Sequence, residues 1–227
     1  MLSFVASQTW RTTYPGAAAG VLAMRGVANP EHHPALDERK QRLESDLRAR
    51  FAGRDAAAIR EIPQVQAYNA YYKQFKKTYH VQLQLESVAL KGKPIPRVAG
   101  LVEAMFMAEL GNLLLTAGHD LDALQGSVRL DIAAGEERYT LLNGQEQALK
   151  AGDMMMADDV GVISSVLYGP DRRTCITPQT RSVLFAVYAA PGIGEDAVRR
   201  HLEDIRANVL LISPEAVVEL LQTVGAG

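Results

Sequence analysis

Residues 109–126, ELGNLLLTAGHDLDALQG, bring His119, Asp120 and Asp122 close together in the chain. A histidine exchanges protons near neutral pH because its unperturbed pKa is about 6.5, so His119 beside a carboxylate is a candidate acid–base group. The same residue types ligate metals, but adjacent His and Asp side chains in one turn rarely converge on one ion, and we predict no metal site. A third reading is structural, in which Gly118 ends a helix and Asp120 or Asp122 starts the next turn.

Other residues capable of chemistry lack the neighbours that a known catalytic motif requires. Ser164 and Ser165 lie in a predicted strand without flanking glycines, and His32-His33 lies in a Pro-rich loop. Cys175 follows two arginines that can lower a thiol pKa, although a packed strand residue is the simpler reading. The sequence has no Gly-rich phosphate loop, G-x-S-x-G, H-E-x-x-H or C-x-x-C motif, so we predict no cofactor.

One stretch is strongly basic. Between positions 73 and 97 a single acid, Glu86, faces six cations: Lys73, Lys76, Lys77, Lys91, Lys93 and Arg97. Four aromatic residues interleave with the first of them: Tyr71, Tyr72, Phe75 and Tyr79. Cations with stacking aromatics suit a nucleic-acid backbone and its bases. Equally, aromatics at helical spacing face a core while lysines stay in water, and the sequence leaves both readings open.

The elements that must position these residues change in character along the chain. Strands are predicted at 4–10 and 19–27, followed by an amphipathic helix at 36–51 with a solvated charged face. Helices are predicted at 62–79 and 80–91, and a buried helix at 98–115. Short β-rich runs follow up to position 190. The end returns to helix, with one apolar stripe in 198–209 and a last helix from Ser213 through Leu221.

This order of elements predicts an α+β fold rather than strict βαβ alternation. The 227 residues, 48% of them hydrophobic, suffice for one large domain, and no long polar linker divides them. The net charge of −2 means that any nucleic acid must bind a local basic patch. One cysteine suits a reducing cytosol, and the acids in 98–115 make that segment a poor membrane span, so we expect a cytoplasmic protein that is not in a membrane.

A series of motifs in residues 96–191 resembles one family. The matching positions are Arg97, Glu109-Leu110-Gly111, Asp120-Leu121-Asp122, Gly126, Gly135-Glu136, Gly144, Glu146, Ala157-Asp158 and Gly169. In this order they resemble the editing module (B3/B4) of the phenylalanyl-tRNA synthetase beta subunit and its free-standing relatives. In this resemblance, Asp120-Leu121-Asp122 is the turn from helix into sheet.

The resemblance implies a single α+β domain over 1–227, a mixed or antiparallel sheet core flanked by helices. The match is clearest in 62–191, with N-terminal strands and a helix in 1–61 and C-terminal helices in 192–227. It implies hydrolysis, in trans and by a positioned water, of the ester in a mischarged aminoacyl-tRNA. Two alternatives are a non-catalytic tRNA or amino-acid binding module and a small-molecule hydrolase. DNA is not an expected partner, and the oligomeric state is left open.

The resemblance also implies the site residues. His119 is the candidate proton-exchange group, Asp171 would hold the substrate ammonium, and Arg172 would meet tRNA phosphate or ribose. Tyr168 and Gly169 would line the pocket with Met105 and Phe106, and the six cations of 73–97 would bind tRNA. The family's G-G-E is Gly169-Pro170-Asp171 here, and Met105 and Phe106 stand where the synthetase pocket has polar residues. An apolar wall leaves a buried tyrosine hydroxyl unpaired, so we expect a smaller or more apolar amino acid.

Overall fold

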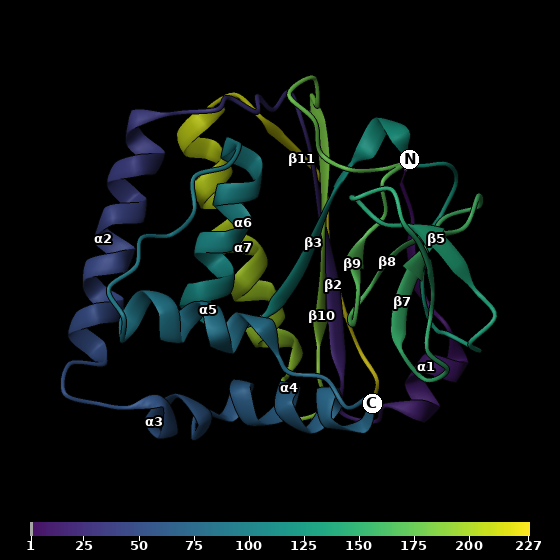
Figure 1. Cartoon of the computed structure of the whole chain (residues 1–227). Helices are drawn as coiled ribbons and strands as arrows, with labels where there is room; N and C mark the ends of the chain where they lie inside the picture. The colour runs from purple at the N-terminus through teal and green to yellow at the C-terminus, as the bar shows by residue number, and fades with distance from the viewer. Residues whose placement is uncertain (1) are drawn as a thin grey trace.

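Two β-sheets form the centre of the computed structural model, which describes residues 2–227. The first is antiparallel, in the order β11-β2-β10-β3, with bounds Val217–Gly225, Ala18–Arg25, Ser182–Ala189 and Leu115–Asp120. Its inner strands β2 and β10 are continuous apolar runs, AAGVLAMR and SVLFAVYA, because both of their faces are covered. Figure 1 shows helices on one side of this sheet and the second sheet on the other.

The second sheet has the order β1-β4-β7-β8-β9, with bounds Phe4–Ala6, Val128–Ile132, Met154–Ala157, Val162–Ser165 and Gly169–Pro170. The pair β1–β4 is parallel and the others are antiparallel. A hairpin, β5 (Arg138–Thr140) and β6 (Glu146–Ala148), lies beside it. The result is a single α+β domain with mixed and antiparallel sheets flanked by helices, as the sequence predicted.

Seven α-helices complete the described residues: α1 Gln8–Thr13, α2 Pro34–Arg50, α3 Ala56–Arg60, α4 Pro63–Gln74, α5 His80–Ala89, α6 Gly100–Asn112 and α7 Glu195–Ile212. Proline stands in the first turn of α2 and α4, where its missing N–H costs nothing. The predicted stripe of α7, Val198, Leu202, Ile205 and Val209, is fully buried. None of the helices in residues 2–227 is long and apolar enough to cross a bilayer.

Three predicted elements differ from the structure. The first strand ends at Ala6, and Ser7 caps α1 by accepting the Trp10 N–H at 3.0 Å. The helix predicted from Ser213 is strand β11, because residues 217–225 pair with β2 along its whole length. The charged face of α2 is not wholly solvated, since Lys40 is buried and donates to Glu103 at 2.7 Å.

The junction of α6 and β3 also differs from the sequence prediction. The helix ends at Leu113, whose φ of 57° is left-handed, and not at Gly118. Gly118 lies inside β3, where an added Cβ would come within 2.7 Å of Ile176 Cδ1. Asp120 does start the next turn, because its Oδ1 accepts the Asp122 N–H at 3.0 Å and caps the short 3-10 helix η1, Leu121–Ala123. The capping interpretation of this aspartate is therefore confirmed.

Candidate functional site

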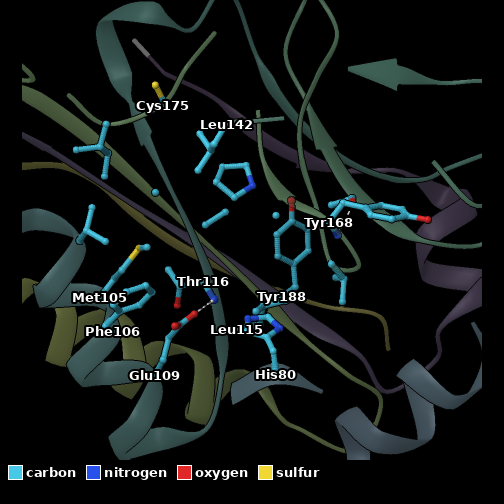
Figure 2. A pocket seen from close by; sticks show the side chains of 18 of the residues that line it. His80, Met105, Phe106, Glu109, Leu115, Thr116, Leu142, Tyr168, Cys175 and Tyr188 are labelled. Carbon is cyan, nitrogen blue, oxygen red and sulfur yellow. Dashed lines mark hydrogen bonds between the residues drawn. The ribbon is translucent and has the colours of Figure 1, made fainter. Parts of the chain in front are cut away.

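A cavity of about 580 Å³ lies between α6, β3 and the segment 165–170. We call it the α6 cavity, and Figure 2 shows the side chains that line it. Helix α6 contributes one face, residues spaced as i, i+3, i+4 and i+7: Val102, Met105, Phe106 and Glu109. Leu142, Val166 and Ile176 add to a wall that is largely apolar. A cavity of this volume is typical of a small-molecule site.

Glu109 is the acidic residue of this wall. Its side chain is only 2% exposed, and its Oε1 accepts the backbone N–H of Thr116 at 2.7 Å. Burial raises the pKa of this carboxyl to about 8, against the smaller opposite effect of that hydrogen bond. Glu109 is therefore mainly protonated at neutral pH and can donate as well as accept hydrogen bonds.

Thr116, next to Glu109, is connected to helix α7 by a chain of hydrogen bonds. Its Oγ1 lies 2.7 Å from His201 Nε2 on α7, and His201 Nδ1 lies 3.3 Å from Asn112 Nδ2. Asn112 Nδ2 also donates to the Asp204 carboxylate at 2.8 Å. Burial lowers the pKa of His201 to about 3, so its ring is neutral. The chain orients the hydroxyl of Thr116 at the cavity wall.

The predicted catalytic residues His119 and Asp171 belong to one buried hydrogen-bond chain that lies outside the α6 cavity lining. Asp171 accepts from the Thr174 N–H at 3.1 Å and from the Thr174 hydroxyl. Thr174 Oγ1 lies 2.8 Å from His119 Nδ1, and His119 Nε2 lies 3.2 Å from Ser164 Oγ. Ser164 Oγ lies 2.7 Å from the hydroxyl of Tyr188, which does line the cavity. This chain of hydrogen bonds therefore meets the cavity lining at Tyr188.

The charge states of this chain follow from its burial. Burial, with a further contribution from the nearby guanidinium of Arg173, lowers the pKa of His119 to about 3. Burial also raises the pKa of Asp171. A neutral His119 with Nδ1–H donating to Thr174 leaves Nε2 as an acceptor for the Ser164 hydroxyl.

The remaining predicted pocket residues are placed in two ways. Tyr168 and Gly169 line the α6 cavity together with Met105 and Phe106, and that these four residues bind a substrate stays a prediction. Arg172 is exposed, and its guanidinium lies against Gly144 of the hairpin turn. Cys175 lines the cavity as a half-buried free thiol.

The six predicted cations of 73–97 are all exposed. Lys77 lies at the cavity rim, because its Nζ is 4.4 Å from the ring centroid of Tyr168. Lys93 lines a smaller cavity of about 180 Å³ that shares Phe106 with the α6 cavity. We group three exposed cations under the name rim cations: Lys77 beside Tyr168, Lys93 in the cavity that shares Phe106, and Arg172, two positions after Pro170 of the lining.

The interleaved aromatics do not face solvent with these cations. They are buried, and they pack against one another: Tyr71, Tyr72, Phe75 and Tyr79. The reading in which they stack on bases is therefore wrong, and the alternative core reading is correct. Within residues 2–227 no cluster of three or more His, Cys, Asp or Glu side chains could hold a metal ion. His32 instead pairs with Asp37 at 2.7 Å.

Sequence reasoning missed Glu109, Thr116 and His201 as site residues. A signal for Glu109 was present, since it is an acid in a strongly apolar helix, seven positions after Val102 on the same face. Thr116 and His201 carried no such signal, because they are 85 positions apart in the chain and meet only in the fold.

The model of the B3/4 domain family matches residues 66–225. The phenylalanine–tRNA ligase beta subunit of Mycoplasma pneumoniae is 35% identical over 69 residues, which are 30% of this chain and 9% of that protein. The Mycoplasma genitalium beta subunit is 29% identical over 69 residues, which are again 30% of this chain and 9% of that protein. An N-terminal fragment of the Pyrococcus horikoshii phenylalanyl-tRNA synthetase beta subunit has the same fold, with a TM-score of 0.51 at 9% identity, over 98% of this chain and 54% of that one.

Proposed function

Since the chain belongs to the B3/4 domain family, we propose that it hydrolyses the ester of a mischarged aminoacyl-tRNA in the α6 cavity. The observation that carries this proposal is the composition of the cavity wall. An apolar surface large enough for an amino-acid side chain meets polar groups of α6 and β3, Glu109 and Thr116, while Ser165, Tyr168 and Tyr188 add further hydroxyls to the lining. The proposal treats residues 1–227 as one functional unit that acts separately from a synthetase.

The apolar wall supports an apolar amino acid. Met105, Phe106 and Ile176 offer no hydrogen bond to a side-chain hydroxyl, so a tyrosine bound against them would leave its hydroxyl unpaired. Such a group costs about 1–3 kcal/mol when it is buried without a partner. Aliphatic amino acids and phenylalanine avoid this cost.

The chemistry needs no protein nucleophile, because an aminoacyl ester is already activated. A positioned water can attack the carbonyl carbon if hydrogen-bond donors stabilise the negative charge that develops on the carbonyl oxygen. Glu109 and Thr116 are polar groups of this wall with protons to donate. Neither His119 nor Asp171 lines the cavity, so in this proposal their role is to hold Ser164 and Tyr188 in place.

The rim cations supply a route for the tRNA. Lys77, Lys93 and Arg172 come from three separate segments around the cavity, and phosphate contacts by such groups position a nucleic acid without reading its sequence. Lys73, Lys76, Lys91 and Arg97 extend the exposed positive charge. With a net charge of −2 for the whole chain, this local patch must provide the attraction.

The proposal is tested by deacylation of a panel of correctly and incorrectly charged tRNAs. We expect release of apolar, wrongly attached amino acids, at a rate that falls when Lys77 and Arg172 are replaced by alanine. Arg206→Ala on α7, where the guanidinium pairs with Glu203, is the matched control and should have no effect. Binding of tRNA with no release from any species would instead support a non-catalytic tRNA-binding module. Failure to bind or hydrolyse any tRNA would refute both.

A further inference from the structure

The hydrogen bonds around Glu109 and Thr116 define where their protons can go. The Glu109 carboxyl makes one hydrogen bond to the described residues, in which Oε1 accepts the Thr116 N–H at 2.7 Å. That bond fixes one oxygen as an acceptor and leaves Oε2 for the proton. Figure 2 shows the carboxyl beside Thr116 at the cavity wall.

The ring of His201 has two polar neighbours besides Thr116: the backbone carbonyl of Ala108, which can accept from the ring, and the side chain of Asn112. The Asp204 carboxylate can only accept, so the Asn112 atom 2.8 Å away is the amide nitrogen, which donates. The same nitrogen is 3.3 Å from His201 Nδ1, which therefore accepts and carries no proton. The proton of the neutral ring is then on Nε2, which donates to Thr116 Oγ1 at 2.7 Å. Thr116 must direct its own hydroxyl proton elsewhere, and its side chain lies at the cavity wall.

We infer that the Glu109 carboxyl and the Thr116 hydroxyl act together as a pair of hydrogen-bond donors for the carbonyl oxygen of the bound aminoacyl group, and that His201 is the residue that positions Thr116. This inference rests on the proposed function for the identity of the ligand. It assigns Glu109 the role of a donor and not that of a base, and these two roles predict opposite pH dependences.

Within residues 2–227, no free cation faces Glu109 to hold it ionised. Of the helices packed against α6, α2 commits Lys40 to Glu103 at 2.7 Å, and α5 contributes His80, whose pKa is lowered by desolvation. Helix α7 contributes His201, whose ring is neutral, and the Asp204 carboxylate, which accepts from Asn112. Strand β3 contributes Thr116. The nearby tyrosines all have raised pKa values and are uncharged: Tyr68, Tyr72 and Tyr79. The pKa of the Glu109 carboxyl is therefore about 8, and the group keeps its proton below that pH.

In the reaction, water adds to the carbonyl carbon and the carbonyl oxygen gains negative charge, which the two donors stabilise. The bond between this carbon and the ribose oxygen then breaks, and the proton lost by the water is transferred to the ribose oxygen. The products are the free amino acid and the terminal hydroxyl of the tRNA. No oxidant, metal or covalent enzyme intermediate enters this balance.

The test compares conservative and truncating variants across pH 6 to 9.5. We expect the wild-type hydrolysis rate, corrected for the uncatalysed rate, to fall about tenfold per pH unit well above the Glu109 pKa. Glu109→Gln keeps a donor, so its rate should be within about tenfold of wild type at pH 7 and should not change with pH. Glu109→Ala and Thr116→Val should each lose about 100-fold or more, while Thr116→Ser retains activity. Glu203→Gln, an exposed carboxyl on α7, is the control.

His201→Phe tests the positioning role. We expect it to lower the hydrolysis rate while leaving the pH midpoint of the Glu109 effect in place, because it acts through Thr116 alone. A rate that rises with pH through the Glu109 pKa, together with Glu109→Gln as inactive as Glu109→Ala, would show that Glu109 is a base and would overturn the inference.

A second measurement separates this inference from the proposed function. The probe is the 3′-amide of leucine with 3′-amino-3′-deoxyadenosine, which keeps the carbonyl but cannot be hydrolysed readily. We expect its affinity for the wild type to weaken above pH 8 and its affinity for Glu109→Gln to stay constant. If the probe affinities behave in this way but no charged tRNA is deacylated, the proposed hydrolysis is refuted and the donor pair is supported. Wild-type binding that is independent of pH and unchanged by Glu109→Gln would refute the donor pair.

Discussion

Replacing Glu109 by glutamine should make the stability of the protein less sensitive to pH, and the size of the effect follows from the buried position of the carboxyl. Burial raises the pKa of Glu109 to about 8, from an ordinary value of 4.5. Between these two values the folded protein binds more protons at this site than the unfolded chain does. The free energy of unfolding therefore falls as pH rises through this window.

The magnitude follows from the difference between the two pKa values. Each pKa unit corresponds to about 1.4 kcal/mol, so the difference of about 3.5 between folded and unfolded states amounts to roughly 5 kcal/mol above pH 8. At pH 7 the part of the window already crossed, about 2.5 pKa units, amounts to roughly 3 kcal/mol. Glutamine keeps the oxygen that accepts the Thr116 N–H and has no charge to desolvate. Its own buried amide adds a constant offset that does not depend on pH.

The assay is urea unfolding of the wild type and Glu109→Gln at pH 5, 7 and 9. The difference in free energy of unfolding between the two proteins should change in favour of the variant by roughly 2.5 kcal/mol from pH 5 to pH 7 and by roughly 1.4 kcal/mol more by pH 9. All other titrating groups are common to both proteins and cancel. Equal slopes for the two proteins would show that Glu109 is ionised in the folded state, and the reasoning about its burial would fail.

Four further predictions concern other parts of the fold. Neutralising Lys73, Lys76 and Lys77 should flatten the salt dependence of tRNA affinity, measured by filter binding between 50 and 200 mM salt; an unchanged slope would place the tRNA elsewhere. His119→Asn should reduce the loss of stability on acidification below about pH 6.5. Burial lowers the pKa of His119 to about 3 in the folded protein, so between these two pH values the unfolded chain binds a proton at this site that the folded protein does not. Thermal unfolding at pH 7 and pH 5 checks this, and identical losses in the two proteins would contradict it. Lys40→Met should cost about 3–5 kcal/mol in urea unfolding by leaving Glu103 buried without its cation, and Lys40→Met with Glu103→Leu should recover most of it. Gly118→Ala should lower the free energy of unfolding in urea by about 1–3 kcal/mol, since its Cβ would lie 2.7 Å from Ile176 Cδ1 and 3.2 Å from Met105 Sδ. An unchanged free energy of unfolding would contradict this, because it would show that the two side-chain ends move aside without cost.

Local patterns predicted most of the elements, and the exceptions share one cause. Helices α2, α4, α5 and α7 follow from apolar spacing with proline at the start of two of them, and these signals lie within each segment. Residues 213–221 carry a good helix start signal, yet 217–225 form β11 because the edge of β2 offers a full set of backbone partners. The end of α6 was misplaced because Leu113 takes a left-handed conformation that its residue type does not favour.

The site was predictable in part. Met105, Phe106, Tyr168 and Gly169 were named from their order in the resemblance to the family, and all four line the α6 cavity; their contact with a substrate stays a prediction. His119 was singled out for its chemistry and Asp171 from the resemblance to the family, and the two side chains are connected by hydrogen bonds through Thr174. The sequence could not show that this chain lies outside the cavity lining. Which face of the sheet a strand residue points to depends on the strand register, and what it meets there depends on the layers packed against the sheet.

What the sequence determined by itself is the α+β class, most helices and strands, and a basic exposed segment, since these depend on composition and on spacing within short windows. The tertiary structure alone decided that the aromatic residues of that segment are buried and that a carboxyl in an apolar helix becomes the proton-carrying group of a cavity. Glu109, Thr116 and His201 come from α6, β3 and α7, and only the packing of these elements brings them together. The pKa of Glu109 is a property of that packing, because it comes mainly from the water that the surrounding elements exclude.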